Sequence, residues 1–399
     1  MNSSTLSGRT VLLILVGVGC GLLLLAEIVA RQQDYLVNND FFTFWLGGRM
    51  IASGEDPYAE QQWLANHDRY GSTWYENPIY PYPLPLTYLF IPLGLLPLRY
   101  AAVMWVWLSE IMILISTWLL MLIEKVPRQA RYILPVLAGL VLWRPVQVTL
   151  RNGQLGAWLL LLIVLVIYLW NRRRWFSGGL LLALTALKPT IGLPLIGLTG
   201  LWLFVRRVWK AILGIILMIG GLFIVGWLRD PQWISKMLWI GSRKLATVWG
   251  YNPTTWGMGG VVCNNAMPCT LYVGAGLSLV LVLAALLALL RHARERKPAF
   301  VVSIIVPVVV LVTPYLWVYD QILLIVPLIL IMGVGIRRGW PYLATALLFP
   351  GAAILSLLLL VLAFQLGHDS LSALLPLSVW LMVIIFGRER VMSPESRNV

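Results

Sequence analysis

Residues 101–123 read AAVMWVWLSEIMILISTWLLMLI, an apolar run in which Glu110 is the only charged side chain. A helix rises about 1.5 Å per residue and the hydrocarbon core of a bilayer is about 30 Å thick, so a run of this length can cross it. Over the whole chain of 399 residues, 60% are hydrophobic and 12% are charged. A typical soluble domain is about 25% charged. The composition therefore predicts an integral membrane protein.

Similar apolar runs recur along the chain, and we expect an all-α polytopic membrane protein with about ten full transmembrane helices in a single domain, residues 1–399. Residues 1–10 lack the basic run of a signal peptide, so the first span is expected to be retained. The predicted spans lie near 11–30, 101–123, 132–150, 155–170, 208–227, 271–290, 299–317, 321–336, 341–364 and 371–386.

The distribution of charge predicts an orientation. If the amino terminus is cytoplasmic, 19 of the 30 basic residues fall on that side, with clusters at Arg172–Arg174 and at Arg206, Arg207 and Lys210. Eleven of the 16 acidic residues then lie at or beyond the opposite surface. Because Lys and Arg are enriched on the cytoplasmic side, the net charge of +14 indicates a membrane address rather than nucleic-acid binding. We expect a multi-pass protein of the cell (inner) membrane with both termini cytoplasmic.

Two apolar segments are too short for a full crossing. Leu84–Pro97 must begin and end outside and is expected to be interfacial or re-entrant. Residues 178–204 lie between two cytoplasmic arginine clusters, so they must enter the membrane and return. Each leg of about 13 residues covers roughly 20 Å, which places the turn at Lys188-Pro189 inside the outer half of the bilayer.

Two external loops are expected to carry the function: residues 31–100, with a polar stretch and interfacial helices, and residues 228–270. In the second loop, Cys263 and Cys269 are candidates for a disulfide in an oxidising exterior. Their spacing leaves open whether the Cα atoms approach to about 4.4–6.8 Å, as a bridge requires. The chain shows no metal-ligand motif and no P-loop, so we expect no metal, no cofactor and no nucleotide.

The first external loop opens with Asn38, Asn39 and Asp40. A carboxylate at this position is a candidate catalytic group, and the alternative is an ordinary solvated side chain. The same loop is dense in aromatic residues, Tyr58 and Tyr82 among them. Such residues are typical either of a membrane-interface belt or of a platform on which sugar rings stack.

Three cations are expected near the outer leaflet: Arg144, Arg151 and Lys188. Cations gathered there would hold a phosphate whose lipid tail stays in the bilayer. The alternatives are that the arginines snorkel to the interface and that the lysine lies in an ordinary loop.

Polar residues accompany these cations in Asn152-Gly153-Gln154 and in Tyr319-Asp320, which follows Thr313-Pro314-Tyr315. The alternative for Asp320 is a short polar turn. Glu110, inside a span, is interpreted as a structural group bonded to a neighbouring helix.

The order of these motifs resembles the GT-C fold glycosyltransferases of family 87, the polyprenol-phosphate-mannose-dependent mannosyltransferases and their relatives. The resemblance spans residues 35–330 and also includes Gly54-Glu55-Asp56-Pro57-Tyr58 and the Tyr-Pro-rich stretch at 80–85. It implies inverting transfer from a lipid-phosphate sugar without a metal. It further implies that Asp40 is the general base, Gln154 the glutamine of a Gly-Gln motif and Lys188 the lysine before proline. Several mannosyltransferases of the family carry histidine where this chain has Tyr319 and Asp320.

We therefore expect a hexosyltransferase that moves a hexose, with mannose as the expected sugar, from a polyprenyl-phosphate donor to an extracytoplasmic lipid or glycan acceptor. The expected partners are that donor, that acceptor and membrane lipids. The expected site residues are Asp40 as the catalytic base, Lys188, Arg144 and Arg151 for the donor phosphate, and Gln154, Asn152, Tyr58, Tyr82, Tyr319 and Asp320 for the substrate.

The competing classes are a flippase or transporter of lipid-linked sugars and a polymerase or ligase of lipid-linked glycans. Against a transporter, the chain has no internal repeat and its polar groups gather on one side of the membrane. Against a polymerase or ligase, the longest loop comes early in the chain rather than late.

Overall fold

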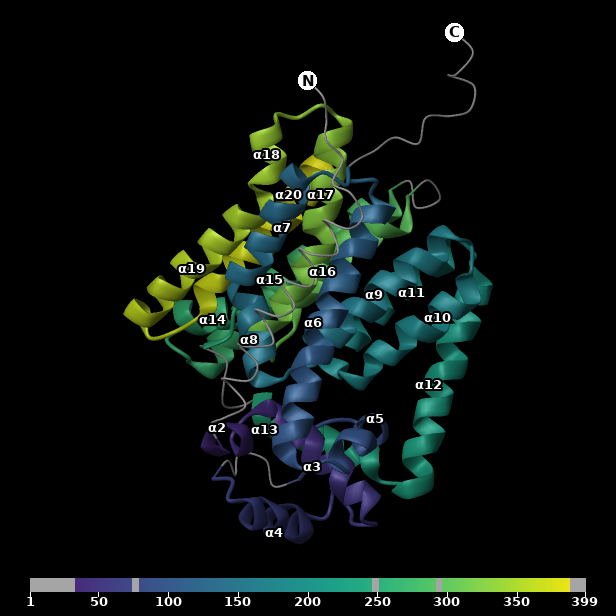
Figure 1. The fold of residues 1–399 in the computed structure, drawn as a ribbon, viewed down its shortest axis with the longest axis vertical. Coiled ribbons are helices and arrows are strands. Elements are labelled where there is room, and N and C mark those ends of the chain that lie inside the picture. Colours follow the sequence, from purple (N-terminus) through teal and green to yellow (C-terminus); the bar gives the residue numbers. More distant parts are fainter. Residues whose placement is uncertain (1–32, 74–78, 246–250, 292–295, 388–399) are drawn as a thin grey trace.

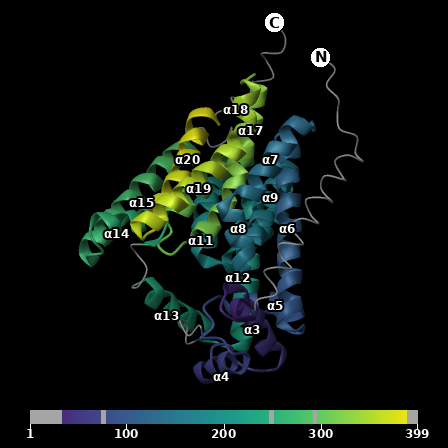
Figure 2. The same cartoon turned by 60° about the vertical axis from the view of Figure 1, so that its left-hand side comes forward.

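The computed structural model describes residues 33–73, 79–245, 251–291 and 296–387, and in these ranges all regular structure is helical. Figures 1 and 2 both place α3, α4 and α13 at one end of an elongated bundle and α18 at the other. The elements are α2 (Gln33–Val37), α3 (Asp40–Ala52), α4 (Glu60–Tyr70), α5 (Leu84–Gly94), α6 (Leu98–Ile123), α7 (Ala130–Leu142), α8 (Arg144–Asn152), α9 (Gly156–Asn171), α10 (Trp175–Leu184), η1 (Thr185–Leu187), α11 (Pro189–Val205), α12 (Trp209–Arg229), α13 (Trp233–Leu245), α14 (Thr255–Val262), α15 (Met267–Leu290), α16 (Pro298–Val312), η4 (Val318–Leu324), α17 (Ile325–Arg337), α18 (Tyr342–Ala346), α19 (Leu348–Leu366), η5 (Ser370–Ala373) and α20 (Leu374–Phe386).

Helices form where the apolar runs predict them, so the all-α expectation is confirmed for the described residues. Five are long and apolar enough to cross a membrane: α6, α12, α15, η4 with α17, and α19. α9, α16 and η5 with α20 are apolar but shorter. The count of about ten spans stays a prediction, as do the orientation and the external position of the loops. The predicted span 11–30 and both termini lie outside the described residues.

The predicted span 132–150 is broken into α7 and α8, whose axes differ by 54°. The break falls at Trp143, and Pro145 lies in the first turn of α8. Proline is favoured in the first turn, where its missing N–H costs no hydrogen bond, and it disfavours a helical residue before it. The bend carries Arg144 to the start of a new helix.

The centre of the bundle is formed by α16 and α17, in which nearly every residue is buried. Both sequences are apolar on every face, which is typical of helices surrounded by protein. By contrast, α12 and α15 bury only 22% of their apolar windows and present leucine, isoleucine and phenylalanine outward. Such surfaces suit contact with lipid chains.

The short segment 178–204 is a broken hairpin, as predicted: α10 and η1 lead to Lys188, and α11 returns from Pro189. Gly192 permits the close approach of its two legs, because a Cβ atom there would lie 2.0 Å from the Thr185 carbonyl oxygen. The other short segment forms α5, which packs against α3 with glycines at the contact. A Cβ atom at Gly48 would lie 2.4 Å from the Phe90 carbonyl oxygen.

The second loop contributes α13 and α14. Cys263 at the end of α14 and Cys269 in the first turn of α15 are joined by a disulfide with a Cα–Cα distance of 5.7 Å. The spacing of the two cysteines left open whether they form a disulfide, and the structure shows that they do.

Glu110 lies in α6 with 3% of its surface exposed. Neither of its carboxylate oxygens has a hydrogen-bond partner among the described residues. The predicted bond to a neighbouring helix is therefore not found in this part of the chain.

Candidate active site

Two cavities adjoin each other between the first loop and the bundle. The first, which we call the Asp40 cavity, has a volume of about 740 Å³. Its polar wall comes from the α2–α3 junction, α8 and the end of α19, and its apolar side comes from Val148, Leu360, Ala363 and Phe364. The polar residues are Tyr35, Asn38, Asn39, Asp40, Thr43, Tyr82, Arg144, Asn152, Tyr251, Tyr315, Tyr319, His368 and Asp369.

The second cavity, which we call the Lys188 cavity, has a volume of about 630 Å³. Its walls are mostly apolar and come from α11, α13 and the end of α16, with Leu193, Leu238 and Val312 among them. Lys188 and Asp320 supply its charged groups.

Four residues line both cavities and therefore form the partition between them: Pro81, Tyr82, Tyr315 and Tyr319. Tyr82 and Tyr319 are two of the aromatic residues predicted to contact substrate. The partition places Asp40 on one side and Lys188 on the other.

Asp40 is positioned by the start of α3. Asn39 is the N-cap, and its side-chain oxygen accepts a hydrogen bond from the Phe42 amide at 3.1 Å. Capping by Asn makes Asp40 the first helical residue, where a carboxylate is stabilised by the positive end of the helix dipole. Asp40 is half-buried and faces the cavity that bears its name.

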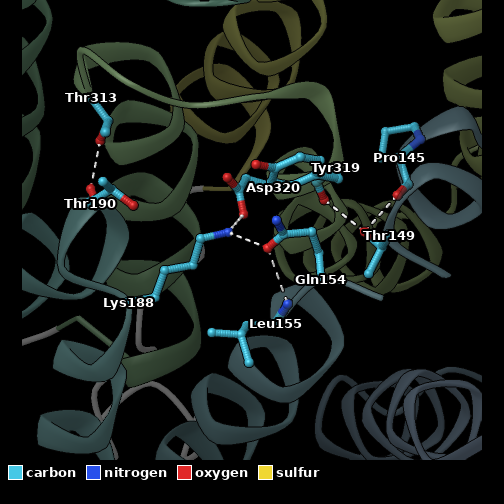
Figure 3. Close-up of polar contacts among 9 residues, drawn as sticks. All are labelled: Pro145, Thr149, Gln154, Leu155, Lys188, Thr190, Thr313, Tyr319 and Asp320. Atoms are coloured by element: carbon cyan, nitrogen blue, oxygen red, sulfur yellow. Dashed lines mark hydrogen bonds and ion pairs between the residues drawn. The ribbon is translucent and has the colours of Figure 1, made fainter. Parts of the chain in front are cut away.

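Lys188 is positioned by the break in its hairpin and by polar partners from distant helices (Figure 3). Its ammonium nitrogen lies 2.5 Å from Oδ1 of Asp320 and 3.3 Å from Oε1 of Gln154, and it donates to both. It also lies 4.8 Å from the centre of the Tyr319 ring. An ammonium group has three N–H donors, so one remains for a ligand.

Two threonines lie where this part of the structure meets its neighbours (Figure 3). The Thr149 hydroxyl of α8 lies 2.7 Å from the Pro145 carbonyl oxygen and 3.0 Å from the Tyr319 carbonyl oxygen, so it links α8 to the segment that carries Tyr319 and Asp320. Thr313 donates to the Thr190 carbonyl oxygen at 2.9 Å and so ties the end of α16 to the hairpin. The partition and the lysine are therefore fixed by the same packing.

Arg144 lines the Asp40 cavity and is paired with Asp369, one of the eleven acidic residues expected at or beyond the outer surface. Its guanidinium donates to both carboxylate oxygens of Asp369, at 2.9 and 2.7 Å, and to Ser372 at 3.2 Å. Two parallel bonds of this kind fix the orientation of an arginine. Arg144 and Lys188 thus line different cavities, although the sequence grouped them around one phosphate.

Arg151 and Asn152 are the last two residues of α8, and both contact Tyr35, which lines the Asp40 cavity. Arg151 is exposed and stacks over the ring of Tyr35. The Tyr35 hydroxyl lies 3.0 Å from two acceptors, the Arg151 carbonyl oxygen and Oδ1 of Asn152, which share its single proton. Burial raises the pKa of Tyr35 and outweighs the opposing effect of Arg151, so this phenol stays protonated. Asn152 lines the cavity and Arg151 does not.

Tyr58 lines neither cavity. It is buried, and its hydroxyl donates to the Tyr82 carbonyl oxygen at 2.5 Å. Tyr58 therefore supports the partition from the side that faces away from the cavities.

Tyr82 itself stays protonated. Burial, followed by the Asp40 carboxylate, raises the pKa of Tyr82, whose hydroxyl lies beside Gln154.

The structure thus brings the predicted residues together in two groups. Asp40, Arg144 and Asn152 line one cavity, Lys188 and Asp320 line the other, and Gln154 lies behind the lysine. Sequence reasoning missed Tyr35, Asp369 and His368 as lining residues. Composition carries no signal for them because their elements reach the cavity only through helix packing.

Comparison with protein families supplies the remaining evidence. The model for glycosyltransferase family 87 matches residues 80–314, which include Arg144, Gln154 and Lys188. Asp40 and Asp320 lie outside the matched range. No curated protein and no solved structure matches the chain significantly. Because the match covers more than half of the chain, this protein belongs to glycosyltransferase family 87.

Proposed function

We propose that this membrane glycosyltransferase moves a hexose, with mannose the first choice, from a polyprenyl-phosphate donor to an acceptor hydroxyl, with inversion and with Asp40 as general base. The acceptor is an extracytoplasmic lipid or glycan in this proposal, and the site faces outward. The observation that carries the proposal is the pair of cavities that share the tyrosine partition, with a carboxylate on one side and an ammonium group on the other.

The Lys188 cavity suits the donor. Its apolar walls from α11 and α13 match a polyprenyl chain, and Leu193 and Leu238 are exposed at its edge. The free N–H of Lys188 would donate to the phosphate, a charge-assisted bond that gains strength where water is excluded. Asp320 holds the ammonium in place and balances its charge.

The Asp40 cavity suits the acceptor. It is the larger and more polar of the two, and its tyrosines offer faces on which a sugar ring can stack. Arg144, fixed by Asp369, offers a rigid cation to acceptor oxygens. We assign the donor phosphate to Lys188 and place Arg144 on the acceptor side.

The chemical step follows from this division. The acceptor oxygen attacks the anomeric carbon at the partition, from the Asp40 side, while the bond between that carbon and the phosphate oxygen breaks on the Lys188 side. Asp40 takes the acceptor proton, and the bond electrons leave with the polyprenyl phosphate. Because negative charge grows on the leaving phosphate, Lys188 stabilises the transition state more than the bound donor.

The test is the variant Asp40→Asn, assayed as purified protein with labelled polyprenyl-phosphate mannose. Loss of a general base costs about 10²–10⁴-fold in turnover, while donor binding should persist. Glu60→Gln is the matched control, because Glu60 is an exposed carboxylate of the same loop at the start of α4.

Turnover by Asp40→Asn close to that of the wild type would refute the assignment of the base. Movement of the intact donor across a vesicle membrane without release of polyprenyl phosphate would instead identify a flippase.

A further inference from the structure

Two turns of the chain have the same unusual backbone. The α9–α10 turn places Arg173 at φ 58°, and the α11–α12 turn places Arg207 at φ 59°. The residue after each arginine also matches: Arg174 has φ −83° and ψ 64°, and Val208 has φ −87° and ψ 65°. In both turns a tryptophan then begins the next helix. The left-handed conformation is usually filled by glycine or asparagine. Lys125 also adopts it, at φ 56°, so what distinguishes the two arginine turns is their position relative to each other.

The two turns lie side by side. The guanidinium of Arg206, in the second turn, lies 5.4 Å from the ring centre of Trp175, which follows the first turn. It also lies 4.9 Å from the ring centre of Trp202. Both turns lie at the right-hand edge of the bundle in Figure 1, where α10 and α11 meet the upper end of α12.

Together the turns carry a concentrated positive charge, which we call the arginine patch. None of its members forms an ion pair with a described residue, whereas Arg144, Lys188, Lys236 and Arg337 each do. Residues 171–210 contain no Asp or Glu. The patch consists of Arg172, Arg173, Arg174, Arg206, Arg207 and Lys210, and all except Arg206 are exposed.

The surroundings of the patch indicate its position relative to a bilayer. Phe204, Val205 and Trp209 are exposed beside it by 57%, 38% and 55%. Exposed apolar residues next to a tryptophan and a ring of cations are typical of the level at which lipid headgroups lie. The helices that begin here, α10 and α12, also lack a side-chain cap, so their first amides add positive potential.

We propose that the arginine patch binds the phosphate of an anionic phospholipid headgroup, such as that of phosphatidylglycerol. Arg173 and Arg207 are exposed on adjacent turns, and Arg206 lies between the turns, packed on tryptophan. Their combined positive charge favours an anionic headgroup over a neutral one. A cluster of cations at the headgroup level attracts anionic lipid by about 1 kcal/mol per residue. The site lies away from both cavities and does not depend on the proposed reaction.

The test uses the full-length protein in neutral detergent, supplied with phosphatidylglycerol, phosphatidylcholine and polyprenyl phosphate, with bound lipid counted by native mass spectrometry. We expect phosphatidylglycerol to be retained in preference to phosphatidylcholine. Arg173→Asn and Arg207→Asn should each lower its affinity about fivefold, the equivalent of one surface cation. Asparagine tolerates the left-handed backbone, so these variants should keep the wild-type melting temperature in lipid-free detergent.

Lys125→Asn is the matched control, because Lys125 is an exposed cation at φ 56° in a turn outside the patch. It should retain phosphatidylglycerol like the wild type. The proposal is overturned if Lys125→Asn weakens binding as much as the patch variants, if both phospholipids bind equally, or if polyprenyl phosphate competes phosphatidylglycerol off the patch.

Discussion

The ammonium nitrogen of Lys188 lies 2.5 Å from a carboxylate oxygen of Asp320, and both side chains are almost fully buried. Burying two charges costs free energy that only close pairing and further hydrogen bonds offset. Lys188 is therefore already paired with Asp320, and only its third N–H is left for a phosphate. Its donation to Gln154 and its contact with Tyr319 place it in a network built from three distant parts of the chain.

Replacement of this pair by apolar residues separates structure from function. Lys188→Met combined with Asp320→Leu should melt near the wild-type temperature, whereas either single change should cost about 3–5 kcal/mol because it leaves one buried charge unpaired. We expect the double variant to release no polyprenyl phosphate from the donor. Thermal unfolding in detergent and a donor-cleavage assay measure the two effects. Wild-type cleavage by the double variant would mean that the pair only supports the fold.

Arg144→Gln tests whether the Asp40 cavity binds the acceptor and the Lys188 cavity binds the donor. Loss of a charged hydrogen bond costs about 1.5–3 kcal/mol, so the acceptor KM should rise about tenfold or more while the donor Kd is unchanged. Arg144→Gln with Asp369→Asn keeps the local charge balanced and should show the same rise. A higher donor Kd in the double variant would mean that the donor phosphate binds in the Asp40 cavity.

Gly48→Ala tests the contact that holds the first loop together. The added methyl would lie 2.4 Å from the Phe90 carbonyl oxygen, so α3 and α5 must separate. Overpacking of this kind costs about 1–3 kcal/mol, which thermal unfolding resolves as a lower melting temperature. Gly197→Ala in α11 is the control, because no atom lies within 4 Å of its Cβ position. Equal melting temperatures for the two variants would contradict the close packing of α3 on α5.

His67 gives the first loop a pH dependence. Burial lowers the pKa of its imidazole from 6.5 to about 4, and it outweighs the opposing effect of Asp68. As the pH falls below 6.5, the unfolded chain takes up a proton that the folded chain does not. The free energy of unfolding should therefore decline between about pH 6.5 and about pH 4. His67→Gln should lose that part of the decline, and identical pH profiles for variant and wild type would exclude His67 as the source.

Much of the local structure could be predicted because short-range physics decides it. Apolar length gave the helices, and proline placed the breaks at Arg144-Pro145 and Lys188-Pro189, since the ring removes a donor and restricts the preceding residue. Asn39 before Asp40 is a capping pattern that acts over a few residues. The order of motifs also anticipated the family that the match to residues 80–314 then showed.

The tertiary structure alone decided which charges meet. Lys188 and Asp320 are separated by 132 positions, and Arg144 and Asp369 by 225. Helices that are apolar on every face, such as α16 and α17, carry no periodic pattern that fixes their rotation or neighbours, so no local rule predicts these pairs. The same packing separates Arg144 from Lys188 by a tyrosine partition and turns Tyr58 away from both cavities. The sequence by itself determined the helices, their breaks and the kinds of residue available for chemistry. Only the packing of those helices, through close contacts between distant segments, divided the residues into two cavities with a shared wall.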